Sequence, residues 1–438
     1  MAIIKPVSNT SITKPTQYIP NAVSVHVPSR ASAALWMLQA FGLLGITFLS
    51  FFPRLFHFQE YAFFLLLAVA LCLAWVERVN PWIRTPIDLP LLGFVGWVLC
   101  TVPFATDPAY SFSEWRKLVA QVLVFYWAMF VLRRCRRVEL SQQIVWAVVL
   151  GSLVLSGFAL VDFILHGGTW RDRLVRAGAP YSDYNWLATY LVLVIPILIG
   201  WVVTHRQLWA RALGILTLIL AGLAQVASYT RAGWAAHFAQ AVGFGLMAGR
   251  RRLVIWVLAG AITMVGGLLA VSQVGYQRDT VDSWTISARV KTWRLGLQQA
   301  TQYPLVGVGY GNDTFSKVHQ GELDADKGKD PAERVLPGLH NTFATVLMGS
   351  GVPALILFIW IFARIVYTLT RQWWQSKVTE TQWLLVAVAV VAVGFATRNL
   401  FDYMFAGSLG YLFWIVTAVG LSLTKHMQEV PAGRHVTL

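Results

Sequence analysis

The chain has 438 residues, of which 57% are hydrophobic and 13% are charged, and its mean hydropathy is +0.58. Soluble domains usually carry about 25% charged residues, so this composition excludes an ordinary cytosolic enzyme, a disordered protein and a fibrous repeat. A membrane-spanning helix needs about 20 apolar residues, and the chain has room for about a dozen such helices. We therefore predict an all-α polytopic membrane protein.

The formal net charge of +15 and the pI near 10.0 would indicate a nucleic-acid partner only if the charge were gathered on one soluble surface. Instead, arginines cluster in short loops, at 133–137 and at 250–252, which places these loops and the N-terminus on the cytoplasmic side. We expect no nucleic-acid partner. Three scattered cysteines predict neither a disulfide framework nor a zinc site.

Residues 1–30 are polar and lack the apolar core of a cleaved signal peptide, so the first hydrophobic run is expected to act as an uncleaved anchor. Apolar stretches then follow as candidate spans at 34–52, 61–76, 88–104, 118–132, 144–165, 186–203, 208–228, 233–248, 253–272, 352–370, 382–397 and 405–424. The predicted organisation is a cytoplasmic tail (1–30), transmembrane helices 1–9 (31–272), a large periplasmic loop (273–338), transmembrane helices 10–12 (339–424) and a second cytoplasmic tail (425–438).

The large outer loop has a pattern of its own. Ser287 can cap a helix over 288–300, which Pro304 would end. The apolar residues of this helix follow helical spacing and form one stripe that could rest on the membrane or on the bundle. A glycine-rich turn follows at 304–311, and the charged stretch 321–333 is expected to be mobile.

Two of the arginines on the predicted outer side are candidate site residues, because orientation signals should keep positive charge out of short outer loops. Arg231 lies in a tight turn between the seventh and eighth spans, close to where the eighth helix begins, and a guanidinium there suits a phosphate group. Arg289 is expected in the first turn of the loop helix. For both residues the alternative is structural: an interfacial arginine that reaches lipid headgroups, or a basic surface helix on anionic lipid.

His340 precedes Asn341 where the outer loop re-enters the membrane as the tenth span. The dipole of a helix N-terminus disfavours a protonated imidazole, and a neutral ring could act as a general base on a hydroxyl. The alternative is a histidine that caps the helix or lies at the interface.

Weaker candidates lie near two other spans. Arg398 and Asp402 are one helical turn apart at the outer end of the eleventh span, a spacing more typical of a local salt bridge than of a site. Tyr184 and Asn185, which enter the sixth span, could line a sugar site through hydroxyl and amide groups. Together with Asn341, these four are candidate substrate-binding residues.

These features together resemble the O-antigen ligase and polymerase superfamily of bacterial envelopes. The resemblance rests on a Ser-x-x-Arg-x-x-Trp turn (Ser228, Arg231, Trp234) and on a large outer loop with Arg289-Val-x-x-Trp293 and Pro304-Leu-Val-Gly-Val-Gly309. It extends to Leu339-His340-Asn341, which stands before a Gly349-Ser-Gly-Val-Pro353 span.

The resemblance implies a fold similar to membrane glycosyltransferases that use lipid-linked donors, with no metal or other cofactor. The implied donor is a glycan on undecaprenyl pyrophosphate at the periplasmic face of the bacterial inner membrane, and the implied acceptor of a ligase is the outer-core sugar of lipid A–core. The family's outer-loop histidine maps onto His340, and its two phosphate-handling arginines map onto Arg231 and Arg289. The arginines would then stabilise charge on the pyrophosphate while His340 takes the proton of the attacking hydroxyl in an inverting displacement.

Three alternatives remain beside an O-antigen ligase. An O-antigen polymerase would add the same donor to another lipid-linked glycan, and a periplasmic protein O-oligosaccharyltransferase would add it to a Ser or Thr. The short tail after the last span favours the ligase over the protein-modifying enzymes, which often have extra C-terminal soluble sequence. A transporter or flippase would place paired polar residues and broken helices at bilayer depth, whereas here polar residues gather at one face.

Overall fold

The computed structural model describes residues 30–135, 137–168, 175–178, 183–250, 255, 283–330, 333–375 and 379–424. Over these residues the chain is helical and contains no strand. The elements are α1 (Arg30–Leu49), η1 (Pro53–Leu55), α2 (Phe56–Val76), α3 (Asp88–Thr101), η2 (Val102–Phe104), α4 (Pro108–Arg134), α5 (Arg137–Leu165), α6 (Tyr184–Thr204), α7 (Leu208–Ala227), α8 (Arg231–Met247), α10 (Ser283–Gln302), α11 (Thr314–Val318), α12 (Gln320–Ala325), α13 (Thr342–Gln375), α14 (Thr379–Asn399) and α15 (Gly407–Ser422).

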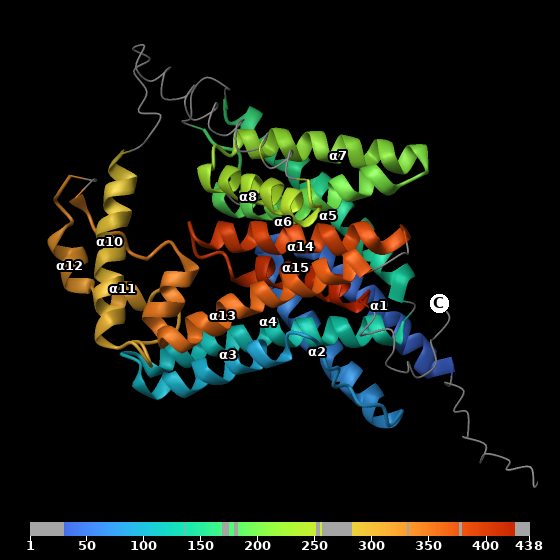
Figure 1. Ribbon diagram of the computed structural model, residues 1–438, viewed down its shortest axis with the longest axis horizontal. Coiled ribbons are helices and arrows are strands. Elements are labelled where there is room, and N and C mark those ends of the chain that lie inside the picture. Colours follow the sequence, from blue (N-terminus) through green and yellow to red (C-terminus); the bar gives the residue numbers. More distant parts are fainter. Residues whose placement is uncertain are drawn as a thin grey trace, which may run out of the picture.

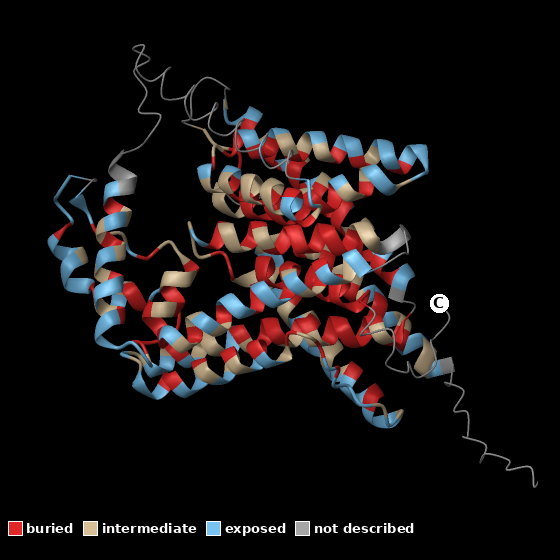
Figure 2. Cartoon of the chain, in the orientation of Figure 1, coloured by how far each residue is buried: buried red, intermediate tan, exposed pale blue. Residues whose placement is uncertain are grey.

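The long helices run side by side as a bundle, and α10, α11 and α12 lie together beyond one end of it (Figure 1). Helix α14 packs against α6, α8 and α13, while α15 packs against α4. Figure 2 shows buried residues concentrated in the central helices, whereas outer helices such as α2 and α7 expose much of their surface. Apolar side chains on α2 are among those exposed, including Trp75 at 83%. Such a surface is expected to face lipid.

Eight of the described helices are long and apolar enough to cross a membrane, and two shorter apolar helices, Asp88–Phe104 and Gly407–Ser422, accompany them. The prediction of an all-α polytopic membrane protein is therefore confirmed. Each predicted span coincides with a described helix except 253–272, of which the structure describes residue 255 alone.

Acidic and amide side chains begin three of the helices at the end of the bundle nearest α10. Asp107 accepts a hydrogen bond from Tyr110 N at the start of α4, and Asp183 accepts one from Asn185 N at the start of α6. Asn341 Oδ1 accepts one from Ala344 N, 3.0 Å away, at the start of α13. These caps satisfy amide groups that a helix leaves unpaired at its N-terminus. We call this end of the bundle the site end.

Charged residues also meet at the opposite end. Arg134, at the end of α4, pairs with Glu77, just after α2, and its guanidinium lies 5.1 Å from the ring of Trp36. Glu77 also accepts a hydrogen bond from Trp36 Nε1 at 2.9 Å. The arginine cluster at 133–137 and the large loop thus lie at different ends of the bundle, as expected for two sides of a membrane.

Helix α13 is broken at Gly351, where φ is 79° and ψ is −179°. The glycine-rich segment 304–311 fills the break: Val308 N donates to Met348 O at 3.0 Å, and Gly309 N donates to Gly349 O at 2.9 Å. Val352 N donates to Pro304 O at 2.7 Å. The predicted turn is confirmed, and its function in the fold is to satisfy backbone groups that the break releases.

Glycine is required on both sides of this contact. A Cβ at Gly351 would lie 2.1 Å from Leu305 O, and one at Gly349 would lie 2.5 Å from Gly309 O. The positive φ at Gly351 also disfavours any other residue. The Gly-Ser-Gly sequence of the tenth span therefore indicates a docking site for another part of the backbone.

One expectation for the outer loop was wrong. Ser287 does not cap the loop helix, because α10 begins earlier, at Ser283, and Ser287 lies inside it. Most described residues of the charged stretch 321–333 are exposed, but the stretch contains most of α12, and its Asp326 is buried between Lys291 and Lys329. The ion pair between Asp326 and Lys291 ties this stretch to α10.

Replacing Gly351 by Ala should destabilise the protein by about 1–3 kcal/mol, because the residue adopts a left-handed conformation and has no space for a Cβ. Thermal unfolding of the detergent-solubilised protein measures this loss. Gly157→Ala on α5 is the matched control, since no atom lies within 4 Å of its Cβ position. Equal melting temperatures for the two variants would contradict the docking of 304–311 on α13.

Candidate functional site

His340 lies at the site end, in the turn that leads into α13. Its φ of 46° is unusual for a residue other than glycine. The preceding residue is held in place by Trp293 on α10, whose Nε1 donates to Leu339 O at 2.7 Å. Because Asn341 supplies the cap of α13, the interpretation of His340 as a capping residue is wrong.

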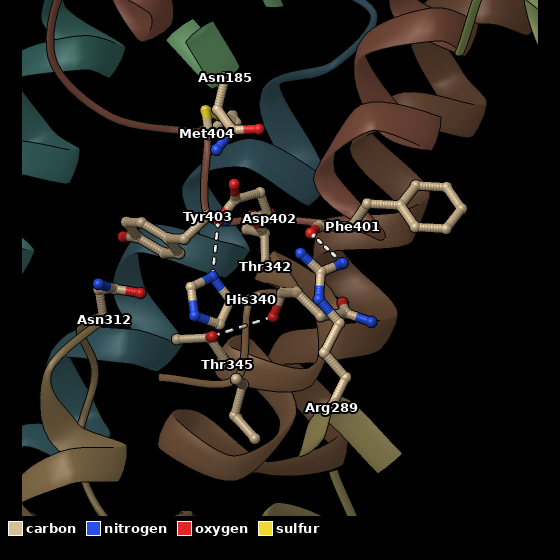
Figure 3. A network of polar contacts seen from close by, with 12 residues as sticks. Asn185, Arg289, Asn312, His340, Thr342, Thr345, Phe401, Asp402, Tyr403 and Met404 are labelled. Carbon is tan, nitrogen blue, oxygen red and sulfur yellow. Dashed lines mark hydrogen bonds and ion pairs between the residues drawn. The ribbon is translucent and has the colours of Figure 1, made fainter. Parts of the chain in front are cut away.

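Asp402 binds the ring of His340. The Nδ1 atom of His340 lies 3.2 Å from Asp402 Oδ1, and Figure 3 shows the second ring nitrogen on the side away from this carboxylate. Tyr403 N donates to the same Oδ1 at 3.0 Å. The imidazole is therefore oriented by a carboxylate that is itself held by the backbone, an arrangement typical of catalytic and metal-binding histidines.

The segment 400–406 that bears Asp402 is anchored by aromatic packing. Phe405 lies in a buried cluster with Phe395 on α14 and Phe413 on α15, whose rings are 4.7 Å apart. Thr342 ties the other side: its Oγ1 lies 2.6 Å from Asn399 Oδ1 and 3.0 Å from Asp402 O. Asp402 is thus fixed relative to the first turn of α13 and hence to His340.

Arg398 approaches the second oxygen of the same carboxylate. Its Nη2 lies 3.7 Å from Asp402 Oδ2, which confirms the predicted local ion pair, and it donates to Asn185 Oδ1 at 3.1 Å. The side chain is fully buried, and among the described residues its Nε and Nη1 have no hydrogen-bond partner. A buried guanidinium that is paired this loosely retains much of its positive field.

The two neighbours of Asp402 also set its charge. Burial by itself would raise the pKa of this carboxyl group. The hydrogen bond from His340 and the positive charge of Arg398 outweigh burial and hold the pKa of Asp402 below its usual value. Asp402 is therefore an anion at neutral pH and can orient the His340 ring.

Arg289 joins this network from α10. Its Nη1 donates to Phe401 O at 3.1 Å, next to Asp402, and Figure 3 shows its guanidinium beside the 401–402 backbone. Within the described part of the chain its buried Nε has no partner. The sequence predicted Arg289 in the first turn of the loop helix. Since α10 begins at Ser283, Arg289 lies instead in the second turn.

Arg231 and Tyr184 border the network. Arg231 is exposed and begins α8, as the sequence predicted. The turn that precedes Arg231 contacts α6, because Thr230 Oγ1 lies 3.4 Å from Tyr184 O. Tyr184 begins α6, and the guanidinium of Arg176 lies 4.6 Å from its ring centre. The structure therefore links His340 to Asp402, Asp402 to Arg398 and Arg398 to Asn185. It brings Arg289 to the adjoining backbone at Phe401 and places Arg231 at the start of α8.

Sequence reasoning missed Arg176, although an arginine in an outer loop is the same signal that singled out Arg231. It also missed Thr342 and Asn399, which support the site through buried hydrogen bonds and show no recognisable pattern. In the described regions no group of three His, Cys, Asp or Glu residues is arranged to hold a metal ion.

An ion cluster on the outer face of α10 supports the His340 turn. Buried Asp326 accepts hydrogen bonds from Lys291 Nζ and Lys329 Nζ, both at 2.7 Å, and from Val335 N at 2.9 Å. The next residue, Leu336, donates its N–H to Thr292 Oγ1. This cluster fixes the chain a few residues before His340.

Asp326→Asn should lower stability at neutral pH, because the lysines and the backbone amide hold the pKa of this carboxyl group well below its usual value. A depressed folded-state pKa stabilises the fold above the unfolded pKa of about 4, and this contribution disappears as the pH falls through the folded value. The difference in melting temperature between wild type and variant should therefore shrink below about pH 4.

Asp324→Asn is the control, since Asp324 is exposed and pairs with exposed Lys327 on the same segment. A difference between wild type and Asp326→Asn that stays constant from pH 7 to pH 3 would rule out the proposed ionic contribution.

Part of the chain matches a known protein family. Residues 215–359, which include Arg231, Arg289 and His340, match the family described as O-Antigen ligase. No curated protein matches the chain. The matched segment contains the turn before α8, helix α10, the docked glycine segment and the broken start of α13. The match over residues 215–359 supports membership of the O-antigen ligase superfamily.

Proposed function

We propose that the chain is an O-antigen ligase. It transfers a glycan from undecaprenyl pyrophosphate to the outer-core sugar of lipid A–core, at the periplasmic face of the bacterial inner membrane. The main support is one observation: a carboxylate-oriented histidine and two buried or half-buried arginines share the segment 398–402 at one end of the bundle. The site end, with α10 to α12, would face the periplasm.

His340 is the general base of this proposal. In the neutral ring, Nδ1–H donates to Asp402 Oδ1, which leaves the lone pair on Nε2 available. The His340 side chain is 36% exposed, so an acceptor hydroxyl can reach it. A base positioned in this way commonly contributes about 10²–10⁴-fold to the rate.

The arginines stabilise the leaving group. When the acceptor oxygen bonds to the anomeric carbon, the bond from that carbon to the pyrophosphate oxygen breaks, and negative charge develops on the pyrophosphate. Arg289 and Arg231 would bind this anion, and Arg398 would add its field from behind Asp402. His340 takes the hydroxyl proton, so a single displacement inverts the anomeric centre. The scheme requires neither a metal ion nor another cofactor.

The rival transferases share this chemistry and differ in the acceptor. A polymerase would use a second lipid-linked glycan, and a protein O-oligosaccharyltransferase would use a Ser or Thr hydroxyl. A flippase would need broken helices that line a path, whereas the backbone groups at the break in α13 bond to 304–309. This closed break favours a transferase.

The decisive assay gives purified protein a lipid-linked glycan with lipid A–core, and separately with a second lipid-linked glycan or an acceptor protein. Glycosylated lipid A–core supports the ligase. A product formed only with the second lipid-linked glycan or with the protein would assign the corresponding rival function, and movement of donor across vesicles without any product would indicate a flippase.

His340→Ala should lower the transfer rate by about 10²–10⁴-fold, because the attacking hydroxyl loses its base. The variant should remain folded, as judged by its melting temperature. His57→Ala is the control, since the side chain of His57 is 83% exposed and lies just after η1. Wild-type rates in a folded His340→Ala variant would remove the general base from the mechanism.

Arg289→Gln should lower the rate constant of transfer by about 10²–10³-fold, the usual effect of losing one donor to a developing anion. Arg289→Lys should recover part of this loss, because the charge returns without the forked geometry. Arg294→Gln changes an exposed arginine on the same helix and should have little effect. Similar losses for Arg289→Gln and Arg294→Gln would indicate a general interaction of α10 with lipid.

A further inference from the structure

The direction of the displacement assigns different roles to the two sides of His340. In an inverting displacement the acceptor oxygen enters opposite to the leaving pyrophosphate. The base must contact the acceptor hydroxyl, while the cations must contact the pyrophosphate. If the proposed function holds, the acceptor sugar therefore binds on the side of His340 that faces away from Arg289.

Asn312 and Tyr403 occupy that side. In Figure 3 Arg289 lies on one side of the His340 ring, and the Asn312 amide and the Tyr403 ring lie on the other. Tyr403 directly follows Asp402, and its backbone N–H donates to the carboxylate that orients His340. Asn312 lies against the turn before His340, with Oδ1 3.9 Å from the Cβ position of Gly338.

The segment that bears Asn312 is held firmly. Gly309 N donates to Gly349 O on α13, and Asp313 N donates to Tyr110 Oη on α4 at 2.9 Å. A Cβ at Gly311 would lie 2.6 Å from the ring of Tyr110, so the backbone rests directly on α4. Asn312 itself is only half-buried. A side chain on a fixed support that remains accessible is suited to bind a ligand.

The chemistry of this side differs from that of the arginine side. Burial raises the pKa of Tyr310 and of Tyr403, and the two hydroxyls hydrogen-bond to each other, so both remain neutral at physiological pH. The Asn312 amide can donate and accept, and it donates to Asp313 Oδ1 at 3.3 Å. Neutral hydroxyl and amide groups match the hydroxyls of a sugar, and they lack the fixed positive charge that would retain a pyrophosphate.

We propose that Asn312 and Tyr403 form the acceptor subsite. The Asn312 amide binds a hydroxyl group of the acceptor sugar beside the proton acceptor of His340, and the Tyr403 ring forms the neighbouring wall. Arg289 forms the opposite wall of the site and binds the pyrophosphate. This inference rests on the proposed transferase function but not on which glycan is the acceptor.

The test separates the Michaelis constants of the two substrates, with undecaprenyl pyrophosphate-linked glycan as donor and the acceptor that wild type uses in the assay above. Asn312→Ala should raise the KM for the acceptor by about three- to tenfold, the loss expected for one neutral hydrogen bond. The KM for the donor should stay within about twofold of wild type. Asn185→Ala, an amide on the Arg398 side, should show the reverse pattern.

Asn80→Ala, at the opposite end of the bundle, should leave both constants unchanged. An unchanged acceptor KM in a folded Asn312→Ala variant, or a rise confined to the donor KM, would overturn the acceptor subsite while leaving the transferase intact. Absence of transfer by wild type to every acceptor would instead overturn the proposed function. Asn312→Ala changes a half-buried side chain on a loop, so it should retain the wild-type melting temperature and keep the test valid.

Discussion

The site depends on the sharing of one carboxylate between the imidazole of His340, in the turn before α13, and the guanidinium of Arg398, on α14. Asp402 presents Oδ1 to His340 and Oδ2 to Arg398, at 3.2 and 3.7 Å. The carboxylate orients the His340 imidazole and partly neutralises the buried Arg398 guanidinium. Without this carboxylate, neither side chain would be held in its observed position. Because Asp402 stays ionised, it can stabilise the imidazolium that forms when the hydroxyl proton is transferred.

The broken helix α13 makes this arrangement possible. The break at Gly351 opens a backbone surface on which the segment 304–311 docks, and this contact places the outer loop over the start of α13. Arg289 then enters the site from α10 on one side of His340, and Asn312 enters from the docked segment on the other. A straight α13 would offer no place for the loop, and the two walls of the site would not meet.

The sequence predicted the class of fold, the positions of most spans and most of the charged site residues, because these follow from apolar length and from charge in unexpected places. Arg231, Arg289 and His340 could be found in this way. The pairing of Asp402 with His340 could not, since the two residues are 62 positions apart. Their meeting depends on the packing of Phe405 in the aromatic cluster. The sequence correctly predicted an ion pair between Arg398 and Asp402. It did not indicate that His340 is the second partner of the Asp402 carboxylate.

The central claim is that a pyrophosphate-linked donor binds between Arg289 and His340 at the site end. The most direct measurement is an experimental structure of the protein with undecaprenyl pyrophosphate in lipid nanodiscs. The account predicts density for the two phosphates within hydrogen-bond distance of the Arg289 guanidinium, on the side of His340 away from Asn312. Phosphate density at the opposite end of the bundle, near Arg134 and Glu77, or on the Asn312 side of His340, would contradict it.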